Sequence, residues 1–131
     1  MAEVARGAGG RSPRTEHSLG PAEAIPPGGH DVFSVAGRQI GVFNIGGDYF
    51  ALPNACFHQN GPLCRGTVGG TVVADAESGW RPEWRLDGEV VVCPWHSLEF
   101  NITTGTCLAY PKRRVPTYPV RVDDGVLRVT L

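Results

Sequence analysis

Short runs of apolar residues recur along this chain, and glycine or proline separates most of them. Residues 32–35 and 39–45 are rich in Val, Ile and Phe and are interrupted at Ala36-Gly37, which predicts two strands joined by a turn. Gly46-Gly47 separates residues 41–45 from residues 48–52, a pattern typical of a two-residue hairpin. The first third of the domain therefore reads as consecutive antiparallel strands.

The same pattern continues to the C-terminus. Residues 89–92 predict a buried strand, and residues 98–102 alternate apolar and polar positions before a turn at 103–105. Residues 118–122 and 126–131 flank an Asp-Asp-Gly turn, so a second hairpin would place Leu127, Val129 and Leu131 on one face. Helix signals are nearly absent, and the fold class is predicted to be all-β, an antiparallel sandwich or partial barrel of short strands.

The 131 residues are enough for one domain. Residues 1–18 lack apolar periodicity and are expected to form a flexible tail, which leaves residues 19–131 as the folded domain.

Two short segments hold candidate metal ligands, each with one cysteine and one histidine. They are Cys56-Phe57-His58 and Cys93-Pro94-Trp95-His96. A two-iron cluster can be held by two thiolates on one iron and two imidazoles on the other. A tetrahedral zinc site also accepts two cysteines and two histidines, so the four residues alone leave both metals open.

The flanking residues narrow this choice. The first box continues as Gln59-Asn60-Gly61-Pro62-Leu63, and with it the chain resembles the Rieske 2Fe-2S ferredoxins, the soluble bacterial type found in ring-hydroxylating oxygenase systems. The resemblance implies a Rieske fold, one 2Fe-2S cluster and a small cluster-binding lobe formed by two loops. It also implies that Cys56 and Cys93 bind the inner iron, and that His58 and His96 bind the outer, more exposed one.

One departure from the family lies between the two boxes. The interval between His58 and Cys93 is 34 residues, longer than in most members, and indicates an insertion at about 67–88. This insertion is interpreted as a hairpin that carries Trp80 and Trp84 and that either covers the cluster, contacts a partner or does neither.

The residues after the second box bear on the redox potential. High-potential members of the family have a Ser two residues and a Tyr four residues after the second ligand histidine, where this chain has Leu98 and Phe100. Neither can donate a hydrogen bond to sulfur, so we expect a potential nearer roughly −150 mV than roughly +300 mV. Ser97 stands where Gly is commoner, and its hydroxyl is a possible donor to a sulfur or a backbone group.

Two cysteines and two histidines remain after the ligands. The disulfide that clamps the loops in respiratory Rieske proteins cannot form in its usual place, since those positions are Gly61 and Trp95 here, and Cys64 and Cys107 are expected to be packing residues. His17 and His30 are too few to supply the second iron site of a Rieske oxygenase, and we interpret both as solvated surface residues.

The formal net charge of −1 and the lack of a basic stripe argue against a nucleic-acid partner. No apolar stretch is long enough to span a bilayer or form a signal peptide, so we expect no membrane association and a cytoplasmic location.

The predicted function is single-electron transfer from a reductase to a terminal oxygenase or other oxidoreductase, through transient contacts of a monomer that is not itself an enzyme. The alternatives are a fixed subunit of a larger reductase, such as the nitrite reductase small-subunit type, and a zinc-stabilised interaction module. The docking face is predicted at the edge that carries His58 and His96, where Pro62, Leu63, Pro94 and Trp95 form the rim.

Overall fold

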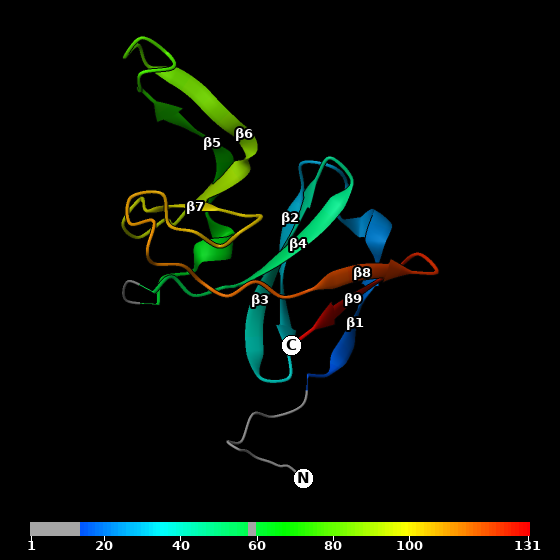
Figure 1. The fold of residues 1–131 in the computed structure, drawn as a ribbon. Helices are drawn as coiled ribbons and strands as arrows, with labels where there is room; N and C mark the ends of the chain where they lie inside the picture. The colour runs from blue at the N-terminus through cyan, green and yellow to red at the C-terminus, as the bar shows by residue number, and fades with distance from the viewer. Residues whose placement is uncertain (1–13, 58–59) are drawn as a thin grey trace.

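A computed structural model describes residues 14–57 and 60–131 of the chain. These residues form short strands and two single-turn 3-10 helices (Figure 1). In chain order the elements are β1 (Glu16–Pro21), η1 (Ala22–Ala24), β2 (His30–Val35), β3 (Arg38–Ile45), β4 (Asp48–Pro53), η2 (Leu63–Arg65), β5 (Thr67–Val73), β6 (Glu83–Val92), β7 (Glu99–Asn101), β8 (Val120–Asp123) and β9 (Val126–Thr130). The all-β prediction is confirmed.

The strands are arranged in three-stranded antiparallel sheets. Their orders are β1-β9-β8, β2-β3-β4 and β5-β6-β7. A bridge between Ala51 of β4 and Tyr118 links the first two sheets. The third sheet contains the segments that lead into and out of the second ligand box, so it supports the cluster-binding lobe.

The turns explain why the hairpins have their observed registers. Ala36-Gly37, Gly46-Gly47 and Asp124-Gly125 connect β2 to β3, β3 to β4 and β8 to β9, and all six residues have positive φ. Two consecutive left-handed residues make the type I′ turn, whose twist matches that of paired strands. The three hairpins predicted from these turns are therefore confirmed.

Two buried clusters fill the interior. One lies beneath the ligand boxes and contains Phe43, Leu52, Phe100 and Ile102 together with all four cysteines. The other packs β3 and β4 against β9 and contains Ile40, Val42, Leu127 and Val129. The inward face predicted for the last strand is confirmed by the burial of Leu127 and Val129.

The N-terminal boundary lies earlier than predicted. Most of the predicted 1–18 tail falls outside the described residues, but β1 begins at Glu16 and pairs along β9. A bidentate ion pair between Glu16 and Arg121 of β8 fixes this end of the strand. Its short, weakly patterned sequence gave no strand signal because its order depends on a partner more than 100 residues away.

The segment predicted to be an insertion forms a hairpin in which β5 pairs with β6, and this hairpin projects from the rest of the molecule (Figure 1). Val72 pairs with Trp84 across the two strands, and Trp80 and Trp84 are both exposed. The second strand is longer than predicted, since it runs without interruption from Glu83 into the buried segment before Cys93.

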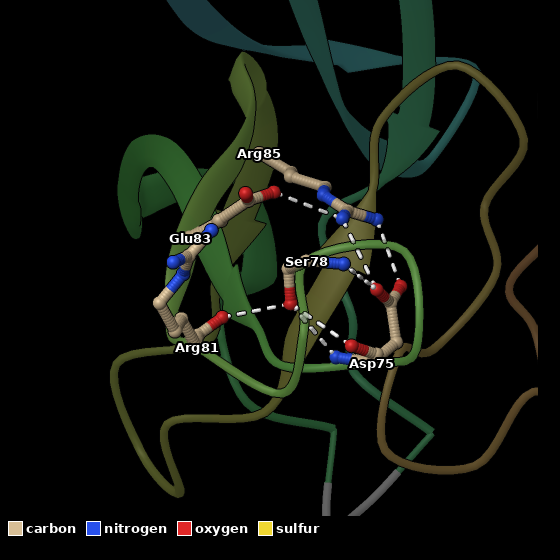
Figure 2. A network of polar contacts seen from close by, with 5 residues as sticks. All are labelled: Asp75, Ser78, Arg81, Glu83 and Arg85. Carbon is tan, nitrogen blue, oxygen red and sulfur yellow. Dashed lines mark hydrogen bonds and ion pairs between the residues drawn. The ribbon is translucent and has the colours of Figure 1, made fainter.

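Polar contacts close the tip of this hairpin (Figure 2). The Asp75 carboxylate accepts hydrogen bonds from the Ser78 N–H and the Arg85 guanidinium, and these two donors lower the pKa of Asp75. The Ser78 hydroxyl donates to the Arg81 carbonyl, while Arg85 also binds Glu83. The network holds a turn in which Trp80 has a left-handed backbone.

Candidate functional site

The two ligand boxes form loops with the same backbone hydrogen bonds. In the first, the Cys56 N–H donates to the Gly61 carbonyl at 2.9 Å, and the Cys56 carbonyl accepts the Asn60 N–H at 2.9 Å. In the second, the Cys93 N–H donates to the Leu98 carbonyl at 2.8 Å, and the Cys93 carbonyl accepts the Ser97 N–H at 2.9 Å. Each cysteine is therefore fixed at the start of a closed turn, and in the second loop the candidate ligand His96 lies within that turn.

The fifth residue of each turn has a left-handed backbone. Asn60 has φ 55° and Ser97 has φ 56°. Asn tolerates this region, but for most residues with a side chain it costs about 1–2 kcal/mol. Ser97 therefore occupies a backbone conformation that glycine adopts without this cost. Ser97 is an exposed residue.

Close approach of the two loops depends on Gly61. A Cβ atom at this position would lie 3.0 Å from the Cys93 Sγ and 3.1 Å from the Trp95 ring. Any side chain there would therefore press on both the second cysteine and the indole. Gly61 lets the backbone of one loop pack directly against the other, which places the two boxes next to each other.

Asn54 braces the first loop from below, a role that the sequence analysis missed. Its side-chain oxygen accepts the Cys64 N–H at 2.8 Å, and its side-chain amide donates to Gln39 at 3.1 Å. These bonds tie the end of β4 to η2 and so join the two ends of the loop. The sequence signal for this contact is a polar residue directly after a predicted strand.

The three described candidate ligands differ in burial. The Cys56 and Cys93 side chains are fully buried, whereas His96 is exposed. His58 lies outside the described residues, so its place in the site stays a prediction. Among the described residues, no three His, Cys, Asp or Glu side chains are grouped so that they could hold a single metal ion.

Apolar side chains surround the cysteines. Phe100 is fully buried in the same cluster as Cys56 and Cys93, and its ring packs edge-on against Phe57 with centroids 5.4 Å apart. Leu98 packs against this cluster as well. The two positions that hold hydroxyl donors in high-potential members therefore present only hydrocarbon to the interior.

A third loop, residues 110–114, reaches the same site and was not predicted. The Arg113 guanidinium lies over the Phe57 ring, 4.3 Å from its centroid. Arg113 and Tyr110 also line a cavity of about 480 Å³ together with Phe57, Leu98 and His96. The loop thus forms one wall beside the exposed candidate ligand.

One predicted docking residue is wrong. Leu63 is fully buried, because η2 turns its side chain into the core beneath the ligand boxes. Pro62 is partly buried, while Pro94 and Trp95 are exposed, Trp95 by 57 %. The exposed rim is therefore built mainly from the second loop.

The spare cysteines are buried thiols, as predicted. Cys64 and Cys107 are free and fully buried, and the Cys64 thiol donates to the Pro53 carbonyl at 3.3 Å. Burial raises the pKa of Cys64 to about 12, so this thiol stays protonated at neutral pH. Both cysteines act in packing.

The two remaining histidines are less solvated than predicted. His17 and His30 are both partly buried. His30 stands opposite Phe43 in the β2–β3 register, and the two rings stack with centroids 5.1 Å apart. Cross-strand pairing, rather than solvation, thus determines the environment of His30.

Comparison with known proteins shows the family of this chain. The family model described as Rieske [2Fe-2S] domain matches residues 15–119. The chain belongs to the Rieske [2Fe-2S] family. Its fold and its one 2Fe-2S cluster follow from this membership, and buried thiols in two matching loops suit such a cluster.

Relatives and solved structures agree with this assignment. The ferredoxin subunit of 3-phenylpropionate/cinnamic acid dioxygenase from Escherichia coli (strain K12) is 29% identical over 93 residues, which cover 70% of this chain and 72% of that protein. The ferredoxin of carbazole 1,9a-dioxygenase from Nocardioides aromaticivorans IC177 is 28% identical, with a TM-score of 0.65 over 88% of this chain and 96% of that one.

A putative NADH-dependent nitrite reductase small subunit from Mycobacterium tuberculosis is 23% identical, with a TM-score of 0.70 over 92% of this chain and 97% of that chain. This last likeness shows a shared fold. No helix among the described residues is both long enough and apolar enough to cross a membrane.

Proposed function

We propose that this protein is a soluble, cytoplasmic electron carrier that takes one electron at a time from a reductase and passes it to a terminal oxygenase or other oxidoreductase. The bound 2Fe-2S cluster supplies one-electron redox chemistry. The observation that carries the proposal is the pair of matching loops, which bury one cysteine each and leave His96 at the surface. The ferredoxin relatives support the same role.

We assign four ligands to the cluster: Cys56, His58, Cys93 and His96. Backbone hydrogen bonds fix both cysteines, so the thiolates need little rearrangement when the cluster binds. The exposure of His96 supports its place on the outer iron, because an electron can leave toward a partner only where the partner can approach.

The decisive test is the EPR spectrum of the reduced protein together with its iron and sulfide content. Mixed Cys/His ligation predicts a rhombic signal and two irons per chain. Cys93→Ala should abolish both, whereas Cys107→Ala is a matched control that removes another buried thiol and should retain them. One zinc per chain without iron would refute the proposal in favour of a zinc-stabilised module.

The alternative role is that of a fixed subunit in a larger reductase. The solved small subunit with the same fold is too distant in sequence to argue for that role. Purification from the native host separates the two: a carrier should elute alone as a monomer, whereas a subunit should co-purify at fixed stoichiometry with a larger chain.

A further inference from the structure

Charge is distributed unevenly over this nearly neutral molecule. The chain has no Asp or Glu between residues 49 and 74, between 90 and 98, or between 100 and 122, the three stretches that contain the two ligand loops and the third loop. The same stretches contain the cations Arg65, Lys112, Arg113, Arg114 and Arg121. Arg121 lies on β8 and pairs with Glu16, so the cations near the ligand loops are Arg65 and the run 112–114, within stretches that contain no acidic residue.

Three of these cations are consecutive in the third loop, and the middle one lines a cavity with the candidate outer ligand. Lys112, Arg113 and Arg114 are all exposed, and none forms an ion pair with another residue of the described ranges 14–57 and 60–131. Arg113 lines the same cavity as His96. Its position over the Phe57 ring fixes one of the three charges next to the first ligand loop.

Exposed aromatic rings accompany the charges. Trp95 is 57 % exposed and Tyr110 is 56 % exposed, one directly before His96 and the other lining the cavity with it. A partly apolar centre with charges at one side is typical of small redox interfaces, in which apolar contact excludes water and charge guides the encounter.

We propose that the face formed by Trp95, His96, Tyr110 and the cationic loop 112–114 docks on a redox protein whose electron-exchange site is bordered by Asp and Glu side chains. The inference rests on the proposed carrier function and specifies the charge of the partner. Opposite charges at this face attract the partner over roughly 30 Å at 0.01 M salt and over roughly 10 Å at 0.1 M, so the attraction weakens as salt is added.

The test uses two small haem proteins of opposite surface charge as electron acceptors, the acidic cytochrome b5 and the basic cytochrome c. In each reaction the reduced protein gives one electron and haem Fe(III) becomes Fe(II), followed by stopped-flow absorbance. We expect the rate with the acidic acceptor to fall as salt rises, and the rate with the basic acceptor to rise.

Charge reversal then locates the effect. Lys112→Glu and Arg114→Glu each change the charge by two units, which at about 10 Å in water lowers the rate with the acidic acceptor by about fourfold. Arg113 is left intact because it packs on Phe57. Arg14→Glu is the matched control: it makes the same change at an exposed residue beside the β1–β9 pair and should leave the rate unchanged.

A second measurement tests binding without electron transfer. Calorimetry gives the Kd for the complex between the oxidised protein and the oxidised acidic cytochrome. This Kd should rise by a similar factor in the Lys112 and Arg114 variants. If these variants match the Arg14 control in rate and in Kd, or if the basic acceptor reacts faster at low salt, the docking proposal is refuted. Failure to reduce either cytochrome at any salt concentration would instead refute the carrier function.

Discussion

Gly66 offers a direct test of how the core positions the second ligand loop. It follows η2 with φ −74° and ψ 178°, a conformation open to any residue, so its lack of a side chain must have a steric reason. A Cβ atom at this position would lie 1.7 Å from the Val92 carbonyl oxygen. Val92 directly precedes Cys93, so the close approach joins η2 to the strand that presents a proposed ligand.

Gly66→Ala should therefore displace the end of β6. The two atoms would have to separate by about 1 Å or more to reach an ordinary contact, and both belong to backbone that is paired with neighbours. Overpacking of this kind costs about 1–3 kcal/mol, and we expect a value at the upper end because no flexible side chain can yield. Denaturant unfolding followed by circular dichroism measures the loss, and visible absorbance reports the cluster.

Gly69→Ala is the matched control, three residues along the same segment. A Cβ there meets only the Trp84 ring at 3.8 Å, an ordinary contact. Alanine in a strand is favoured over glycine by up to about 1 kcal/mol, so this variant should be as stable as the parent protein or slightly more stable. Equal unfolding midpoints for the two alanine variants would show that contact between Gly66 and Val92 does not position the loop.

Three further predictions concern the lobe and its neighbours. Gly61→Ala should lower the free energy of unfolding by about 1–3 kcal/mol and should also lower the iron content, because the new methyl group presses on Cys93 and Trp95. An unchanged iron content would contradict this. Phe100→Tyr should raise the midpoint potential if the new hydroxyl donates a hydrogen bond to a sulfur. The rise in protein-film voltammetry should be about 40 mV for each kcal/mol by which this bond favours the reduced state. An unchanged potential would show that the hydroxyl does not reach a sulfur. Burial raises the pKa of Cys64 from 9.0 to about 12, so the folded state retains a proton that the unfolded state loses, and stability falls as pH rises through this window. Cys64→Ala lacks this thiol, so the unfolding free energy of the parent minus that of the variant should fall by up to about 1.4 kcal/mol per pH unit across the window; parallel pH profiles would contradict this.

Local sequence signals were enough to predict the hairpins and the ligand loops. Paired left-handed residues at three turns fix the register of the strands that they connect, and each loop is closed by bonds between residues at most five positions apart. Both features are determined within a few residues, so they can be read from the chain itself.

Features that depend on distant contacts were missed. Leu63 follows a proline in a Gly-Pro-Leu run that suggests a surface loop, yet η2 directs it into a core made by residues from β3, β6 and β7. The cationic loop reaches the site only because Arg113 finds the Phe57 ring, 56 positions earlier in the chain. β1 likewise acquires its order from β9, at the opposite end of the domain.

The long insertion changes the surroundings of the second loop without closing over it. Thr71 of β5 donates a hydrogen bond to the Glu99 carboxylate at 2.7 Å, three residues after His96, so the hairpin is attached to the strand that leaves the ligand loop. A groove of about 570 Å³ separates the two segments, lined by Val73 on one side and Ser97 on the other. His96 nevertheless remains exposed. The hairpin therefore contacts the strand that follows the second ligand loop and leaves the edge that carries His96 open to a partner.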